Sequence, residues 1–198
     1  LIGYLHDSLP ADHPHARTRA MPDGVAAPEI WMLGSGGDSA ELAARFGCAF
    51  SFAQFIHGAD GAGAVRDYRQ HFRPSIFLAE PTASAAVFVV CAETEAEAQL
   101  LASSGELWRL RIERGVERPF PPVEEARSHP YTEAETMRLA QLRARNVVGA
   151  PEQVKHKLLE IAERYGVDEL LLVTITHDFE ARVRSYELIA QAFDSNRT

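Results

Sequence analysis

A glycine- and serine-rich segment, Leu33-Gly34-Ser35-Gly36-Gly37-Asp38-Ser39, carries the clearest chemical signal in the sequence. It follows an apolar, strand-like run and precedes residues with helical spacing, so its glycines would let the backbone approach a ligand closely. The N–H groups at the start of that helix would favour an anion such as a phosphate, and Ser35 and Ser39 would add hydroxyl donors. Asp38, with Glu41 three residues later, also fits an ordinary N-capping box, and its carboxylate would repel a phosphate placed close to it. The spacing leaves both interpretations open.

A second candidate site follows the last apolar run of the chain. Thr174, Thr176 and His177 come directly after it, and ligands of α/β proteins gather at the carboxyl ends of strands. These three residues are therefore candidates for the rim of a substrate pocket. The alternative is that Thr176 and Asp178 cap the terminal helix while His177 is solvated.

A third candidate is the aromatic segment of residues 50–57, which ends a predicted strand. Phe52 and His57 are its candidate pocket residues, although aromatic residues at this density more often belong to a hydrophobic core. No spacing in the sequence identifies a catalytic residue, a nucleophile elbow or a metal site.

The elements that would position these residues alternate between strands and helices, with uncharged strand centres. This pattern predicts an α/β fold with a parallel sheet covered on both faces. Residues 1–28 are rich in proline and are expected to form a connecting arm, and residues 115–130 a long, mobile insertion loop. The predicted strands are residues 29–34, 48–53, 84–91 and 169–174.

Composition narrows the class of protein. The chain has 198 residues, which fits one domain, and its 20 basic against 28 acidic residues argue against nucleic-acid binding. No run of 18 apolar residues suggests a membrane span. Cys48 and Cys91 lie apart in apolar runs, which predicts buried, reduced thiols in a cytoplasmic protein.

Two long segments resemble a known family. PEIWMLGSGGDSAELAARFGCAFSFAQFI resembles the sixth and seventh βα units of the bacterial luciferase-like, flavin-dependent monooxygenases, and NVVGAPEQVKHKLLEIAERYGVDELLLVTITHDFEARVRSYELIAQAF resembles their closing segment. The resemblance implies a TIM barrel that binds reduced FMN, uses O₂ as co-substrate and oxidises a small organic substrate. It also implies a homodimer supplied by a separate flavin reductase. In that family the glycine- and serine-rich turn helps to hold the flavin phosphate, and it corresponds here to Gly34, Ser35, Gly36, Asp38 and Ser39.

Length qualifies this expectation. A (β/α)₈ barrel needs about 250 residues, so we expect residues 1–198 to be the C-terminal portion of an incomplete barrel. The first half would then hold the catalytic residues, and this fragment alone would be inactive. The alternative is a shortened, non-catalytic module for flavin binding or dimerisation.

Overall fold

The structure, a computed structural model, describes residues 1–56 and 61–194 and divides into two compact units. The first unit, Leu1–Ile30, contains the short helix α1 (Ile2–Leu5), which is followed by turns. Within it, the Tyr4 hydroxyl donates a hydrogen bond of 2.9 Å to the Arg19 carbonyl. The prolines of this unit prevent a longer helix, as the sequence predicts.

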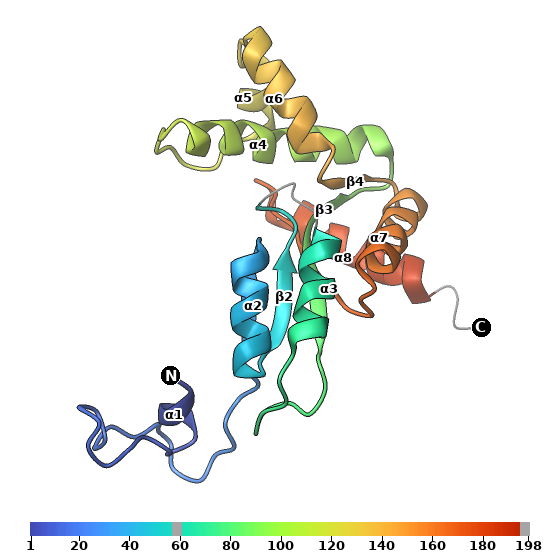
Figure 1. Ribbon diagram of the computed structural model, residues 1–198. Helices are drawn as coiled ribbons and strands as arrows, with labels where there is room; N and C mark the ends of the chain where they lie inside the picture. The colour runs from blue at the N-terminus through green and yellow to red at the C-terminus, as the bar shows by residue number, and fades with distance from the viewer. Residues whose placement is uncertain (57–60, 195–198) are drawn as a thin grey trace. The chain divides into compact units, whose positions relative to one another are not determined.

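The second unit, Trp31–Thr198, is built on a parallel sheet (Figure 1). The predicted α/β class and all four predicted strands are therefore confirmed, with ends that differ by one or two residues. A fifth, short strand was not predicted from the sequence. The strands are β1 (Trp31–Gly34), β2 (Ala49–Ala53), β3 (Ala83–Cys91), β4 (Val147–Gly149) and β5 (Leu170–Val173).

The long strand β3 organises the sheet. It pairs with β2 through residues 83–86, with β5 through residues 85–88 and with β4 through residues 89–91, while β2 pairs on its other side with β1. Because every pair is parallel, the carboxyl ends of the strands meet at one edge of the sheet.

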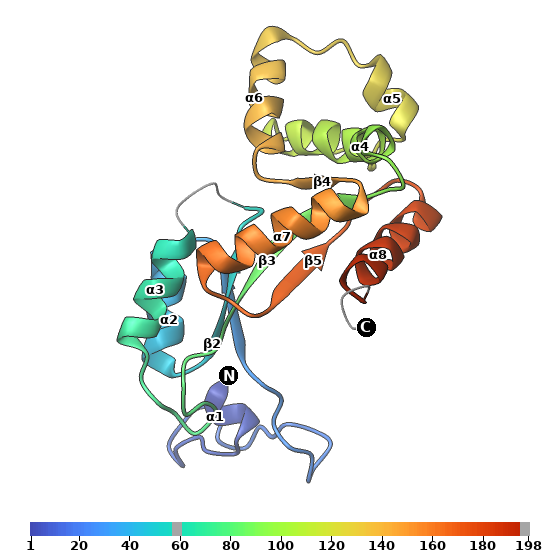
Figure 2. The ribbon, with the colours of Figure 1, turned by 90° about the vertical axis from the view of Figure 1, so that its right-hand side faces the viewer.

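The helices fall into two groups. Figures 1 and 2 show α2, α3, α7 and α8 running alongside the strands, whereas α4, α5 and α6 gather beyond their carboxyl ends. The helices of this unit are α2 (Gly37–Phe46), α3 (Gly61–His71), α4 (Glu95–Glu113), α5 (Val123–Ser128), α6 (Glu133–Arg143), α7 (Pro151–Tyr165) and α8 (Phe179–Asp194).

The hydrophobic core lies on one face of the sheet. Alternate strand residues such as Phe50, Phe52 and Val87 are fully buried there, against apolar side chains of α2, α3, α7 and α8. On the opposite face, Leu33 and Leu171 remain 59% and 45% exposed. The expectation that both faces are covered is thus wrong for the described residues, which leave part of the second face open.

Helix ends follow the sequence closely. Gly47 and Gly166 end α2 and α7 with positive φ angles of 63° and 62°, a conformation that glycine adopts without strain. Pro151 stands in the first turn of α7, where its missing N–H costs no hydrogen bond. These turns set the entry points of β2 and β5 into the sheet.

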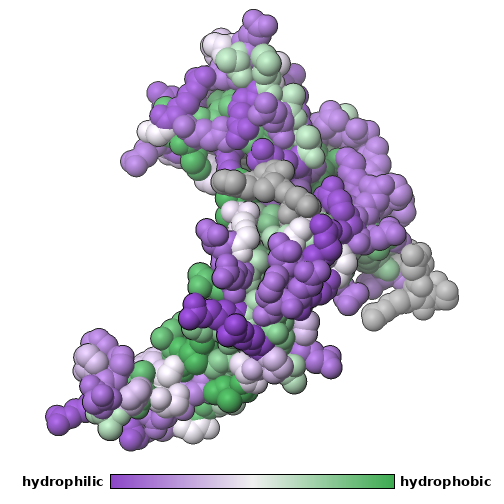
Figure 3. Space-filling model, viewed as in Figure 1, coloured by the Kyte–Doolittle hydropathy of each residue, from purple (hydrophilic) through white to green (hydrophobic). Residues whose placement is uncertain are grey.

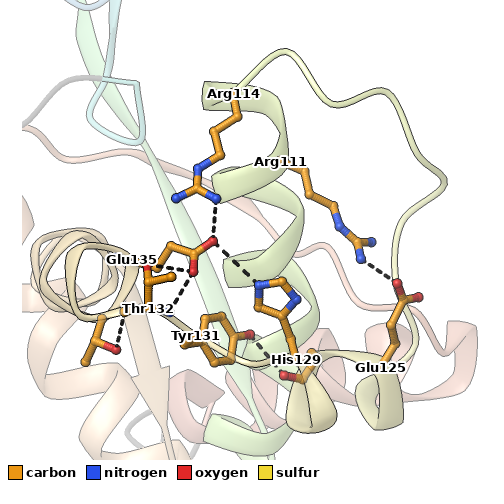
Figure 4. Close-up of polar contacts among 9 residues, drawn as sticks. Arg111, Arg114, Glu125, His129, Tyr131, Thr132 and Glu135 are labelled. Carbon is orange, nitrogen blue, oxygen red and sulfur yellow. Dashed lines mark hydrogen bonds and ion pairs between the residues drawn. The ribbon is translucent and has the colours of Figure 1, made fainter.

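The segment of residues 115–130 differs from the predicted loop, because it contains helix α5. Pro122 precedes the first turn of α5, and an ion pair joins Glu125 to Arg111 of α4 (Figure 4). The Tyr131 hydroxyl donates to the Ala126 carbonyl at 3.0 Å. Contacts with α4 and with Tyr131 therefore order a helix that is too short to be predicted from its own residues.

Helix α6 begins with a capping box (Figure 4). The Thr132 hydroxyl accepts from the Glu135 N–H, and the Glu135 carboxylate accepts from the Thr132 N–H at 2.8 Å. Arg114 lies 2.7 Å from the other Glu135 oxygen, and His129 lies 3.5 Å from it. This carboxylate, although its side chain is only 5% exposed, is held by partners from three segments.

Candidate functional site

The glycine-rich turn lies at the carboxyl end of β1, where α2 begins. Gly36 is the N-cap residue of α2, with an extended backbone (φ -154°) and no side chain bonded to the first turn. The predicted capping box of Asp38 and Glu41 is therefore wrong, because Asp38 lies inside the helix. Ala40 is the first residue whose N–H reaches a helical acceptor, the Gly36 carbonyl. The N–H groups of residues 37–39 have no acceptor within the helix.

The surroundings of this turn fit a phosphate. A Cβ added at Gly36 or Gly37 would meet no atom within 4 Å, so the space before the helix is open. The hydroxyls of Ser35 and Ser39 make no hydrogen bond with another described residue. Asp38 is solvent-exposed, so its carboxylate can stay in water while its N–H faces the open space. Donors are thus present, and Asp38 would contribute its backbone alone.

Gly34 has a separate, steric role in this turn. A Cβ at Gly34 would lie 2.2 Å from both Cβ and Oγ of Ser39. Non-bonded carbon atoms in van der Waals contact are about 3.5–4.0 Å apart. Glycine at this position is what lets the first turn of α2 pack against the end of β1.

A cavity of about 60 Å³ lies where the carboxyl ends of β3 and β5 meet α4. Its walls include two aromatic pairs: Phe55 with Phe88, at a ring-centroid distance of 4.7 Å, and Trp108 with Phe120, at 5.7 Å. Hydrophobic residues also reach the surface among hydrophilic ones at the α4–α6 end of this unit (Figure 3). The cavity has several times the space that one buried water needs.

Charged residues line the same cavity. Glu106 is 8% exposed, and both of its carboxylate oxygens accept hydrogen bonds of 2.7 Å from Arg143. This pairing raises the pKa of Arg143 above its usual value. Arg145 also lines the cavity, and its carbonyl accepts a hydrogen bond from the Gln54 side chain at 2.8 Å. The Glu106 carboxylate at the cavity wall is therefore already paired with Arg143.

Arg109 is paired less completely. Its Nε is buried and makes no hydrogen bond, although it lies 3.5 Å from Oε1 of Glu113. That carboxylate is held by Arg138 through two hydrogen bonds of 2.8 and 2.7 Å, which lower the pKa of Glu113. The other contact of Arg109 is a long one, 3.4 Å from Nη2 to the Ile56 carbonyl. The wall therefore presents a guanidinium group whose contacts are long and whose acidic partner is shared with Arg138.

The other described sequence candidates do not line this cavity. Thr174 is fully buried, and its N–H donates to the Tyr186 hydroxyl of α8. The Thr176 hydroxyl donates to the Asp178 carbonyl at 2.6 Å, and His177 is exposed. Asp178 caps α8 by accepting from the Ala181 N–H. The capping alternative is confirmed for Asp178, and none of the three rim candidates lines the cavity.

Phe52 belongs to the core, where its ring meets Tyr165 edge to face at 5.6 Å. His57 lies outside the described residues. The cavity is lined by close neighbours of these candidates: Phe55, three residues after Phe52, and Val173 and Ile175 on either side of Thr174. The alternation of strand side chains was the signal that would have found Val173. Nothing in the sequence pointed to Trp108 or Arg109, because they come from α4.

Within residues 1–56 and 61–194, no helix is long and apolar enough to cross a membrane, and no three His, Cys, Asp or Glu side chains form a group that would hold a metal ion.

The parallel strands, the helices packed along them and the ligand-type features at the strands' carboxyl edge define part of a TIM-barrel protein. The comparisons make the class specific. Residues 7–169 match the model of the luciferase-like monooxygenases, and the chain belongs to that family.

Individual relatives agree with this assignment. The chain is 42% identical over 190 residues to the uncharacterized protein YceB of Bacillus subtilis (strain 168), a match that covers 96% of this chain and 57% of that protein. The crystal structure of apo-MsnO8 superposes with a TM-score of 0.80 at 33% identity, over 95% of this chain and 57% of that one. The chain therefore spans little more than half the length of these relatives, which fits an incomplete barrel.

A more distant structure carries a flavin. The oxygenating constituent of 3,6-diketocamphane monooxygenase from Pseudomonas putida, in complex with FMN, has a TM-score of 0.53 at 21% identity, over 92% of this chain and 53% of that one. At this identity the likeness concerns the fold.

Proposed function

We propose that this chain is the C-terminal portion of an FMN-dependent monooxygenase that uses reduced flavin and O₂ to oxidise a small organic substrate. The observation that carries the proposal is the start of α2, where three N–H groups without helical acceptors and two serine hydroxyls without a hydrogen bond to another described residue adjoin the open space at Gly36 and Gly37. Because the chain belongs to the luciferase-like monooxygenase family, we infer that the anion bound at this helix start is the phosphate of a flavin.

Each residue of the turn has a distinct task in this proposal. The N–H groups of Gly37 and Asp38 and the hydroxyls of Ser35 and Ser39 donate to the phosphate, and the helix dipole favours its negative charge. Gly36 and Gly37 keep the approach free of side chains, and Gly34 lets the first turn of α2 pack against β1. FMN, when bound and reduced, supplies the electrons for oxygen chemistry, and the chain contributes anchoring, orientation and a pocket wall.

The remaining features of the enzyme follow from the same proposal. A closed barrel of this type has eight strands, so the activity belongs to a whole barrel of which this chain forms part. We place it in the cytoplasm as a homodimer, with a flavin reductase as the partner that provides reduced FMN. The exposed apolar residues Leu33 and Leu171 support the view that more of the barrel packs on this face.

Binding of FMN and of riboflavin, which lacks the phosphate, tests the anchoring directly. In the Ser35→Ala/Ser39→Ala variant, we expect FMN binding to weaken about 10-fold or more, because two hydrogen bonds to a charged group are lost. Riboflavin binding should not change. Ser103→Ala, which removes a hydroxyl from α4, is the matched control.

Turnover is measured as O₂ consumption and product formation with NADH, a flavin reductase and a panel of organic substrates. Absence of both FMN binding and flavin-dependent turnover in the whole protein would refute the proposal. FMN binding without turnover would favour the non-catalytic module instead.

A further inference from the structure

We propose that the cavity between α4 and the carboxyl ends of β3 and β5 binds a small aromatic carboxylate, with its ring among the aromatic walls and its carboxylate paired with Arg109. The inference rests on the proposed function in one respect: if the chain is part of a monooxygenase, this ligand class is its substrate class. The binding itself requires no flavin.

The aromatic walls of the cavity favour a ligand whose apolar part is an aromatic ring. Phe55, Phe88, Trp108 and Phe120 come from four separate stretches of the chain and line one space. Aromatic rings prefer offset or edge-to-face neighbours with centroids about 4.5–7 Å apart, an arrangement that a planar ring from a ligand can join. A saturated hydrocarbon chain would bury apolar area in this cavity but would not gain the favourable contacts between aromatic rings.

The cavity is smaller than one aromatic ring, so a single-ring ligand would lie partly inside it and partly in its open mouth. Its volume is about 60 Å³, and it is partly open to solvent. An apolar cavity of about 150 Å³ is large enough to enclose benzene, so a ring must enter here from the open side. A fused ring system would extend into solvent.

The charges select the polar part. Arg109 and Arg145 line the cavity together with Glu106, and Arg143 occupies both oxygens of Glu106. The cavity is therefore a basic site in a chain of formal net charge -8. This contrast favours an anionic ligand over a cationic one.

Arg109 is the residue that a carboxylate would meet. Its Nε makes no hydrogen bond, and its side chain is 26% exposed, so it extends from the buried wall toward solvent. Glu113, its acidic neighbour, makes shorter contacts with Arg138 than with Arg109. Because both present contacts of Arg109 are long, its terminal N–H groups can turn to a carboxylate in two-point geometry.

Fluorescence of Trp108 tests the proposal. The sequence has two tryptophans, Trp31 and Trp108, so Trp31→Phe leaves a single reporter in the cavity wall. Phenylacetate is titrated into the full chain without flavin, beside phenylacetamide as its uncharged analogue and cyclohexylacetate as its non-aromatic analogue. Calorimetric titration of the chain with both tryptophans provides a second measurement. Melting temperatures of all variants identify any that fail to fold.

Phenylacetate should change Trp108 emission saturably, and the two analogues should bind about 10-fold more weakly or worse. Arg109→Gln should weaken phenylacetate binding about 10- to 100-fold and leave phenylacetamide unchanged, because the lost contact is a charge-assisted hydrogen bond. Arg109→Lys should restore part of the affinity. Arg45→Gln, which removes one exposed positive charge from α2, is the matched control and should have no effect.

Three results would overturn the proposal. The first is no saturable binding of phenylacetate, and the second is equal binding of phenylacetate to the Arg109→Gln and unsubstituted chains. The third is competitive displacement by FMN that depends on Arg109, which would make the cavity part of the flavin site. Because flavin is absent from the main titration, failure of FMN binding counts only against the proposed function. Loss of phenylacetate binding with intact flavin-dependent turnover counts only against the ligand class.

Discussion

Substitution of Gly34 by alanine should dislodge the start of α2. The added Cβ would lie 2.2 Å from Cβ and Oγ of Ser39, more than 1 Å inside the usual contact distance. Gly34 has no positive φ, so alanine brings no backbone strain of its own. The entire cost comes from the collision with Ser39, which must move together with the first turn of α2.

The cost is that of an overpacked site, about 1–3 kcal/mol in the free energy of unfolding. For a protein of this size, 2 kcal/mol corresponds to a decrease in melting temperature of about 4–8 °C. Gly37→Ala is the matched control, because its Cβ would meet no atom within 4 Å. Alanine in a helix is favoured over glycine by up to about 1 kcal/mol, so this variant should be unchanged or slightly more stable.

A double-mutant cycle isolates the collision. Ser39→Gly removes both atoms that the new Cβ would strike, so Gly34→Ala should cost little when Ser39→Gly is already present. Chemical unfolding of the four proteins gives the coupling energy, which should be about 1–2 kcal/mol in the direction of rescue. Equal costs of Gly34→Ala with and without Ser39 would refute the steric argument, as would a loss of stability in Gly37→Ala as large as that in Gly34→Ala.

Three further predictions concern buried groups. Phe52→Ala should lower the free energy of unfolding by about 3–5 kcal/mol in denaturant titrations, because Phe52 is fully buried. Phe179→Ala, at a residue that is 67% exposed, should change it by less than about 1 kcal/mol. Similar values for the two variants would contradict the assigned core. Hydrogen bonding from the Thr132 N–H lowers the pKa of Glu135, so its contribution is present above the unfolded-state pKa of about 4.3 and is lost as pH falls through the folded-state value. Unfolding measured between about pH 6 and 3 should show a smaller loss of stability in Glu135→Gln than in the parent chain, and identical slopes would count against this. Burial raises the pKa of the Cys91 thiol to about 11, so iodoacetamide at about pH 8 should label it only after unfolding, as mass spectrometry of intact protein would show.

Local sequence signals predicted the elements that depend on local chemistry. The strands, the glycine-ended helices α2 and α7 and the proline at the start of α7 follow from hydrophobic spacing and from Gly47, Gly166 and Pro151. Helix α5 could not be predicted from local signals, because it is only six residues long and is held by Arg111 of helix α4. Strand β4 has three residues, too few for a periodicity to be read.

The candidate sites show the same division. The turn at residues 34–39 lies within one stretch of chain, and its place before α2 could be predicted from the glycines alone. The cavity is assembled from residues as far apart in the sequence as Phe55 and Ile175, and Arg109 of α4 is part of its wall. Phe52 and Thr174 are buried beside segments that line the cavity but do not line it themselves, since neighbouring residues of a strand point to opposite faces.

The central position of β3 determines which backbone amides are exposed only when the whole sheet unfolds. Ala85 and Ala86 are paired on both sides, with β2 and with β5, whereas β1 is paired with β2 alone among the described strands. Amide protons that are buried and bonded in the middle of a sheet exchange with solvent only when the largest cooperative unit unfolds. In a deuterium-exchange experiment, the amides of residues 85–88 should therefore be the last of this sheet to exchange, and those of β1 among the first. The slowest-exchanging core of the molecule would then lie directly beneath the strand ends that carry the cavity.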